Sequence, residues 1–380
     1  MVNRCHVAMC TASIGGCTLQ CSNAEGVQMQ SIERPATALR RGRDLPARAA
    51  PGLAWVLLGA LLQAAWPVLA AAPPAGPVEV PLWPAVAPGS EGLALDRRIV
   101  ERSTDPALPD RYADGIATPS LTVYRPARAD GRALLVVPGG GYQRVVLDKE
   151  GSALVPSFAE AGGLTLFVLQ YRLPGEGHQD ARDVPLADAQ RALRLIRSRA
   201  AEWGIDPATL GVMGFSAGGH VAASLATRHA EKVYAPVDAA DALDARPAYA
   251  LLVYPVIDMG AHAHPGSRRR LLGDAPADEA IHAYSLQHRV DAHTPPVFLL
   301  HAQDDVAVPV ENSLLFEQAL RAVGIEHETH LYAHGGHGFG VRAAHGTLAL
   351  WPQLAIAWIR AHAALADDHD NAAPTRTAQD

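Results

Sequence analysis

The chain has 380 residues, a formal net charge of −7 and scattered arginines without a basic stripe, so its composition argues against a nucleic-acid-binding protein. Its four cysteines, Cys5, Cys10, Cys17 and Cys21, all lie near the N-terminus and lack the CxxC spacing of a zinc site. The rest of the chain has no cysteine and no disulfide, so its stability has to come from a hydrophobic core.

An uncharged apolar run, LAWVLLGALLQAAWPVLA, occupies residues 53–70, and several arginines precede it. This order of basic residues, apolar core and following alanines predicts a secretory signal peptide over residues 40–72, with cleavage after Ala70. A membrane anchor is the alternative, because about 18 apolar residues is the lower limit for a span. Pro67 and the alanines favour cleavage. We therefore expect a secreted or periplasmic protein without a membrane partner, and a doubtful or disordered leader at residues 1–39.

Beyond this segment, short runs rich in Val, Leu and Phe alternate with longer segments of helical periodicity. This alternation predicts an α/β fold with a mostly parallel central sheet and helices on both faces. The expected strands are Leu121–Tyr124, Ala133–Val137, Leu164–Tyr171, Thr209–Gly214, Ala248–Tyr254, Pro296–His301 and His327–Tyr332. The expected helices lie at about 150–162, 186–202, 217–229, 311–323 and 347–364.

Residues 258–290 interrupt the alternation with a longer, irregular interval. The interval is too short for a separate domain, so we expect a small lid-like excursion over the strand ends. One domain is expected over residues 73–366. The polar segment at residues 367–380 is expected to be a disordered tail.

The motif Gly214-Phe215-Ser216-Ala217-Gly218 stands between an expected strand and an expected helix. On such a turn the serine hydroxyl stands above the strand ends, and the amide of Ala217 points at the same space. A serine between glycines is often only a turn, so a nucleophilic role for Ser216 requires partners elsewhere in the chain.

Two later stretches offer those partners. A nucleophilic serine needs a histidine to take its proton and a carboxylate to orient that histidine. HAQDDVAVP offers Asp304 and Asp305, and HGGHGFG offers His334 and His337. The glycines around His337 suit a residue that turns inward, so His334 is expected to be a loop or surface histidine. The order serine, acid, histidine, each after a strand, is that of α/β-hydrolases, in which parallel strands bring such loops to one edge.

A glycine-rich segment, VVPGGGY, ends the expected strand Ala133–Val137. Negative charge that develops on a carbonyl oxygen during acyl transfer needs backbone amides fixed in advance. Consecutive glycines leave such amides uncovered by side chains. The segment is therefore a candidate oxyanion loop.

Together these motifs resemble the α/β-hydrolase esterases grouped with acetyl xylan esterases and related feruloyl or acetyl esterases. The resemblance covers about residues 80 to 365. It is carried in chain order by PGGGY, EG, YRLPGEG, PLADAQRALRLIR, GFSAGGH, YPVIDM, TPPVFLLHAQDDVAVPVENS and GGHGFG. Pro138 stands where the hormone-sensitive-lipase-like relatives have a histidine, which argues against a lipase.

The resemblance implies a role for each matching residue. Ser216 would be the nucleophile, Asp305 the acid and His337 the base. The amides of Gly140, Gly141 and Ala217 would form the oxyanion hole. The family pattern selects Asp305 over Asp304, which would then be a solvated neighbour or a loop cap.

Other polar residues near these motifs have simpler interpretations. Asp258 is a further candidate acid, but a turn-capping role fits it better. His220 is expected to pack in the core with its N–H satisfied. The HAHP segment at residues 262–265 lacks a second ligand group at a useful distance, so no metal is expected. Glu150 is interpreted as a carboxylate in the first turn of a helix, without a catalytic role.

The resemblance implies a secreted serine carboxylesterase that removes short acyl groups, above all acetyl, from carbohydrates such as xylan. Its partner would be a small-molecule or polysaccharide ester, and no cofactor is expected. Two alternatives remain open. One is a related hydrolase of peptides or lactones, and the other is a non-catalytic binding protein on the same fold. The oligomeric state does not follow from the sequence.

Overall fold

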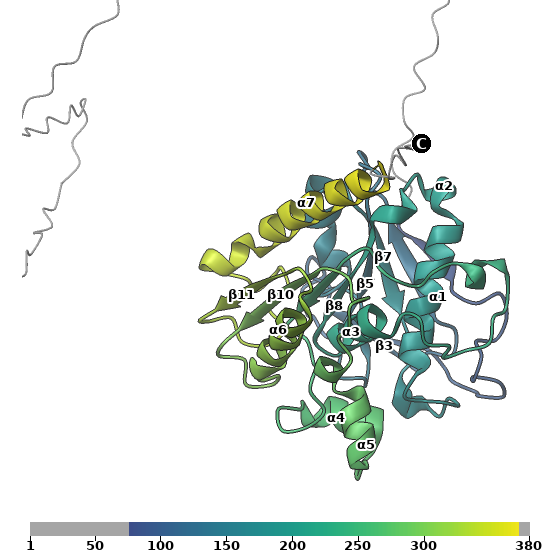
Figure 1. Cartoon of the computed structure of the whole chain (residues 1–380). Coiled ribbons are helices and arrows are strands. Elements are labelled where there is room, and N and C mark those ends of the chain that lie inside the picture. Colours follow the sequence, from purple (N-terminus) through teal and green to yellow (C-terminus); the bar gives the residue numbers. More distant parts are fainter. Residues whose placement is uncertain (1–75, 372–380) are drawn as a thin grey trace, which may run out of the picture. The chain divides into compact units, whose positions relative to one another are not determined.

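The computed structural model describes residues 76–371, drawn in colour in Figure 1. The expected leader at residues 1–39 and signal peptide at residues 40–72 lie outside the described residues. The last helix runs to Asn371, beyond the expected domain end at residue 366. The rest of the expected tail lies outside the described part.

A sheet of eight strands forms the centre of the domain. In sheet order the strands are β1 (Val78–Pro81), β4 (Ser120–Tyr124), β7 (Thr165–Gln170), β5 (Ala133–Val137), β8 (Leu210–Phe215), β9 (Ala250–Val253), β10 (Val297–Ala302) and β11 (His327–Tyr332). The strands from β7 to β11 in this order are parallel, whereas β1 and β4 are antiparallel to their neighbours. The chain leaves β5 toward β7 and returns on the other side to β8. The ends of β5 and β8 therefore form the switch point at which such sheets bind ligands.

Helices cover both faces of this sheet. The helices are α1 (Val184–Ser198), α2 (Ala200–Trp203), α3 (Ser216–Arg228), α4 (Pro265–Leu272), α5 (Asp278–Tyr284), α6 (Glu311–Val323) and α7 (Trp351–Asn371). A second, small antiparallel sheet joins β2 (Arg98–Glu101), β3 (Arg111–Asp114) and β6 (Val145–Val146). No helix within residues 76–371 is both long enough and apolar enough to span a membrane.

Strand alternation divides the core into two layers. Leu135 and Val137 of β5 belong to the cluster that contains residues of α1, α3 and α6. Leu134 and Val136 of the same strand belong to the cluster that contains residues of α7, such as Trp351. Successive side chains of a strand point to opposite faces, so an all-apolar strand is buried on both sides. Figure 1 shows α1, α3 and α6 on one side of the strands and α7 on the other. The expected α/β-hydrolase fold is confirmed by this arrangement.

The structure differs from the expected elements mainly where they are short or irregular. β1, β2 and β3 were not predicted, because four-residue strands carry little periodic signal. The helix expected at about 150–162 is a 3₁₀ turn, Ser152–Leu154, followed by a π-helix, Val155–Ala161. The helix expected at 186–202 divides into α1 and α2.

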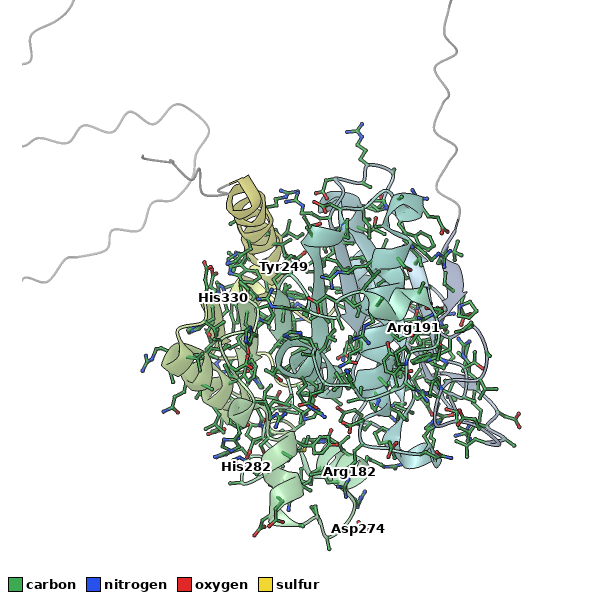
Figure 2. The ribbon with its side chains drawn as sticks, turned by 45° about the vertical axis from the view of Figure 1, so that its right-hand side comes forward. Arg182, Arg191, Tyr249, Asp274, His282 and His330 are labelled. Carbon is green, nitrogen blue, oxygen red and sulfur yellow. The ribbon has the colours of Figure 1, made fainter. Side chains whose placement is uncertain are left out.

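The excursion expected at residues 258–290 contains α4 and α5, which lie together at one end of the sheet in Figure 1. In Figure 2, His282 and Asp274 mark this segment at the end of the domain remote from Tyr249. Tyr249 directly precedes β9, so the excursion lies on the side where the parallel strands end. The same edge carries the predicted site residues.

Candidate active site

Ser216 stands on the sharp turn between β8 and α3. Its backbone φ of 52° is left-handed, a value that a non-glycine residue seldom adopts and that marks a strained position. Gly218 lets α3 begin close to β5, because a Cβ on this residue would lie 2.2 Å from the carbonyl oxygen of Val137. The side chain of Ser216 is largely buried, but it lines a pocket that opens to solvent.

The structure brings the predicted acid and base to this serine. His337 follows β11, and its Nε2 lies 2.8 Å from the Oγ of Ser216. Asp305 follows β10, and its Oδ2 lies 2.6 Å from the Nδ1 of His337. In the tautomer that satisfies both contacts, Ser216 donates to Nε2 and Nδ1–H donates to the carboxylate. Three residues from distant parts of the chain thus form one continuous line of hydrogen bonds.

Asp305 is held in place as an anion. Burial of its carboxyl would raise its pKa, but hydrogen bonds from His301, His337 and the Val308 amide outweigh burial and keep the pKa well below the ordinary value. The second histidine, His301, lies on β10 with its Nε2 3.2 Å from Oδ2 and its other ring nitrogen 2.8 Å from Ser313 Oγ. In the sequence analysis His301 was only the last residue of an expected strand, Pro296–His301. A lone histidine in the otherwise apolar strand VFLLHA was the available signal.

The glycine segment lies opposite these groups. Gly140 and Gly141 both have positive φ values and both line the pocket together with Ser216 and His337. Within the described residues neither amide donates a hydrogen bond to another protein group, whereas the Gly139 amide donates to Glu150 Oε2 across 2.7 Å. The Ala217 amide stands at the N-terminus of α3. Two of the three predicted oxyanion residues, Gly140 and Gly141, therefore border the pocket, and the third, Ala217, directly follows Ser216 on α3.

The interpretation of Glu150 as a first-turn helix residue was wrong. The nearest helical turn begins at Ser152, and the carboxylate of Glu150 is buried behind the glycine segment. It accepts hydrogen bonds from the Gly139 amide and, across 3.0 Å, from the hydroxyl of Tyr254. Burial raises its pKa. Tyr254 also accepts a hydrogen bond from the Gly340 amide, so these two residues join the glycine segment to the histidine loop. Sequence reasoning missed this connection.

The rival acid and rival base lie together outside the pocket. Asp304 accepts hydrogen bonds from the amides of Gly335 and Gly336 across 2.9 and 2.8 Å, so it caps the loop that carries His337. His334 is almost fully exposed and lies 3.4 Å from Asp304. Both residues thus have the roles expected for them, a loop cap and a surface histidine.

Asp258 and His220 also have structural roles. Asp258 accepts hydrogen bonds from the His262 amide and from Gln287, which fixes both ends of the excursion. His220 is buried, accepts from the hydroxyl of Tyr142 across 2.7 Å and donates to the carbonyl oxygen of Tyr284. Desolvation lowers the pKa of His220 to about 4, so its ring is neutral at physiological pH.

The space in front of Ser216 is a pocket of about 320 Å³, bordered by the glycine segment, by His337 and by His264 of the excursion. His264 caps α4, because its ring accepts a hydrogen bond from the Ser267 amide. The hydrogen-bonded serine, the uncovered amides and the open pocket together have the geometry required for attack on an acyl carbonyl.

Comparison with known proteins assigns the chain to a family. The BD-FAE family matches residues 121–320, which is more than half of the chain. The chain belongs to the BD-FAE family. The Dienelactone hydrolase family matches residues 272–373, which include Asp305 and His337. The predicted resemblance to acetyl xylan esterases of the α/β-hydrolase fold is therefore confirmed.

This chain is similar to an acetylxylan esterase of Xylanibacter ruminicola, to which it is 35% identical over 225 residues. These residues are 58% of this chain and 43% of that protein. Endo-1,4-beta-xylanase B of Butyrivibrio fibrisolvens is 39% identical over 208 residues, which are 55% of this chain and 32% of that protein. The chain thus spans less than half the length of either relative. The fold is also similar to the crystal structure of an acetyl ester-xyloside bifunctional hydrolase from Caldicellulosiruptor lactoaceticus, with a TM-score of 0.62 and 33% sequence identity. The superposition covers 75% of this chain and 96% of that chain.

Proposed function

We propose that this protein is a serine esterase that removes short acyl groups, above all acetyl, from carbohydrates such as xylan. The observation that carries the proposal is the line of hydrogen bonds from Ser216 through His337 to Asp305, facing the amides of Gly140 and Gly141 across one pocket. The named activities of the acetylxylan esterase and of the acetyl ester-xyloside hydrolase support the substrate class.

In the proposed reaction, His337 Nε2 takes the proton of Ser216 as the serine oxygen attacks the acyl carbon. The amides of Gly140, Gly141 and Ala217 stabilise the negative charge that forms on the carbonyl oxygen. The carbon–oxygen bond to the sugar then breaks, and the imidazolium gives its proton to the leaving oxygen, which leaves an acyl-enzyme. A water molecule, deprotonated by His337, attacks this ester and releases the acid and Ser216. Throughout, Asp305 holds the ring orientation and stabilises its charged form.

The experiment is an ester panel measured on the wild type and on Ser216→Ala. The panel holds acetylated xylan, 4-nitrophenyl esters of increasing acyl length, a lactone and a peptide amide. We expect the wild type to prefer acetyl esters, and Ser216→Ala to lose on the order of 10⁶ in kcat. Equal, negligible rates for both proteins on every ester would refute the proposal and favour a non-catalytic binding protein.

Lactone hydrolysis is the second candidate function, and the match to the Dienelactone hydrolase family favours it. It would use the same three side chains, since a lactone is an internal ester. The panel distinguishes the two functions by kcat/KM. A lactone that is hydrolysed faster than every acetyl ester would assign the protein to the second function.

We also propose export of a single catalytic domain at residues 73–366, after cleavage behind Ala70 within the signal-peptide segment at residues 40–72. The support is the apolar run 53–70 with its preceding arginines and following alanines. N-terminal sequencing of protein recovered outside the cytoplasm tests this proposal, and we expect the mature chain to begin at Ala71. Recovery of the protein only inside the cell with residues 1–39 intact would refute it.

A further inference from the structure

The pocket in front of Ser216 is strongly basic, although the whole chain has a net charge of −7. Its lining contains the five basic side chains of Arg102, Arg144, Lys149, Arg269 and Arg270. Glu150 is the one acidic residue in this lining, and its buried carboxylate is already bonded to the Gly139 amide and to Tyr254. The positive charge of the lining is therefore not balanced from within the pocket.

Most of these basic groups also lack an acidic partner outside the pocket. Arg102 pairs with Asp110 at 2.6 Å. The other four form no ion pair with any acidic residue in the part of the chain that the structure describes. Two buried arginines elsewhere in the domain, Arg172 and Arg191, are paired with Asp188 and Asp238. The Nε of Arg144 is buried without a hydrogen-bond partner, although its guanidinium lies over the ring of Tyr112.

The unpaired cations come from two separate segments that border the pocket. Arg144 and Lys149 follow the glycine segment, and Arg269 and Arg270 belong to α4 of the excursion. Like charges held near one another repel, so such a cluster is unfavourable unless an anion enters between them. A cleft lined with one sign of charge also attracts ligands of the opposite sign. Guanidinium groups bind carboxylates especially well, because two N–H groups can donate to the two oxygens.

We infer that the natural substrate carries a carboxylate on its alcohol portion, as in an O-acetylated saccharide that contains a uronic acid. This inference rests on the proposed function, because it takes Ser216 as the nucleophile and a short acyl group as the part transferred. An acetyl group has no charge of its own, so the anion has to belong to the sugar that leaves. The unpaired cations would hold that sugar while its ester faces Ser216.

The test compares acetate release from methyl O-acetyl-β-glucuronoside and from methyl O-acetyl-β-glucoside, with the acetyl on the same hydroxyl. We expect kcat/KM to be about tenfold higher for the glucuronoside at low ionic strength, within the range of electrostatic steering. The ratio should fall toward one in about 0.5 M salt, because salt screens exposed charges. A second comparison places the carboxylate on the acyl group, by measuring 4-nitrophenyl hemisuccinate against 4-nitrophenyl butyrate. We expect no preference for the hemisuccinate.

Variants connect the preference to the named cations. Lys149→Met and the double variant Arg269→Ala/Arg270→Ala should each lower the glucuronoside-to-glucoside ratio by at least about threefold, since each removes charge from the pocket. The matched control is Arg268→Ala, because Arg268 lies on the same helix but lines a neighbouring hollow and not the serine pocket. This control removes one positive charge, as Lys149→Met does, and the ratio should stay at the wild-type value.

Each outcome separates this inference from the proposed function. A wild-type ratio of one or below, with acetate still released from the glucoside, would overturn the inference and leave the esterase proposal intact. An equal fall in the ratio for Arg268→Ala would also overturn it, because net charge alone would then explain the preference. A preference for the hemisuccinate without one for the glucuronoside would move the anion to the acyl side and refute the inference as stated. Loss of acetate release from every ester would refute the proposed function itself.

Discussion

Two adjacent aspartates, Asp304 and Asp305, have different surroundings. Asp305 is buried and accepts hydrogen bonds from two histidines and two backbone amides. Asp304 instead accepts hydrogen bonds from two backbone amides of the loop that carries His337. The chain pattern alone left both as candidate acids, and the family resemblance favoured Asp305. The hydrogen bonds explain how one turn supplies both a partner for the histidine ring and an anchor for its loop.

We predict that Asp305→Asn lowers kcat on an acetyl ester by about 10⁴-fold, because an amide in this place favours the wrong histidine tautomer. Steady-state kinetics on 4-nitrophenyl acetate measure the effect. Asp304→Asn is the matched control, since its amide oxygen can still accept from the Gly335 and Gly336 amides. If the control loses as much activity as Asp305→Asn, the proposed assignment of the acid is wrong.

We predict that His220 makes the stability of the protein depend on pH. Its folded-state pKa of about 4 lies below the ordinary value of 6.5, so between these values the unfolded chain binds a proton that the folded chain does not. Stability is therefore complete above about pH 6.5 and falls as the pH drops toward 4. The loss from this residue is about 3 kcal/mol, at 1.36 kcal/mol for each unit of pKa.

The measurement is urea unfolding of the wild type and of His220→Gln at pH 7 and at pH 4. Glutamine keeps a polar side chain between Tyr142 and Tyr284 but does not titrate. We expect the free energy of unfolding to fall by about 3 kcal/mol more in the wild type than in the variant. Equal losses in the two proteins would show that His220 does not contribute to acid sensitivity.

At the scale of elements, the turn from β8 into α3 depends on close backbone packing. A Cβ on Gly214 would lie 2.3 Å from the carbonyl oxygen of Gly218 and 2.5 Å from the Cβ of Ala222. The glycines in the GFSAGGH motif therefore do more than permit a turn. They let the first turn of α3 approach the strand that precedes it, which sets the position of Ser216.

We predict that Gly214→Ala lowers the free energy of unfolding by about 1–3 kcal/mol, the usual effect of overpacking. Gly175→Ala is the control, because its added Cβ would meet nothing nearer than 3.7 Å and should change stability by less than about 0.5 kcal/mol. Urea unfolding measures both. If Gly214→Ala is as stable as the control, α3 can move away from β8 without a measurable loss of stability, and the prediction is wrong.

At the scale of the whole domain, a buried polar network joins the segment after β1 to the sheet and to α1. Arg172 and Asp188 are both fully buried and pair at 2.8 Å. The indole N–H of Trp83 donates to the same carboxylate across 2.9 Å, and Arg172 donates to Pro88 and Ser90. The network thus connects three parts of the chain with one satisfied ion pair.

We predict that Asp188→Asn destabilises the domain by about 3–5 kcal/mol, because it leaves the buried guanidinium of Arg172 without a counter-charge. The midpoint of urea unfolding, followed by circular dichroism, measures this loss. Glu202→Gln is the control, since it breaks the Arg199–Glu202 ion pair at the surface, where water replaces the partner. An Asp188→Asn protein no less stable than this control would show that the network contributes little.

The parallel strands and the order of the site residues followed from local patterns. The strand Ala133–Val137 has the predicted bounds, because an apolar run that ends at a proline and three glycines identifies a strand without any knowledge of its neighbours. The strand His327–Tyr332 also has the predicted bounds. The positions of Ser216, Asp305 and His337 at one edge were predicted for a related reason. Parallel strands all end on the same side, so chain order is enough to bring their loops together.

Contacts between residues distant in the chain were decided only by the tertiary structure. The sequence could not indicate that Glu150 bonds to the Gly139 amide and to Tyr254, since side-chain direction in an irregular segment has no periodic signal. For the same reason it did not indicate that cations after the glycine segment and cations on α4 share one pocket. Local propensity depends on neighbours in the chain, whereas the charge of a cleft depends on which surfaces the folded chain brings together.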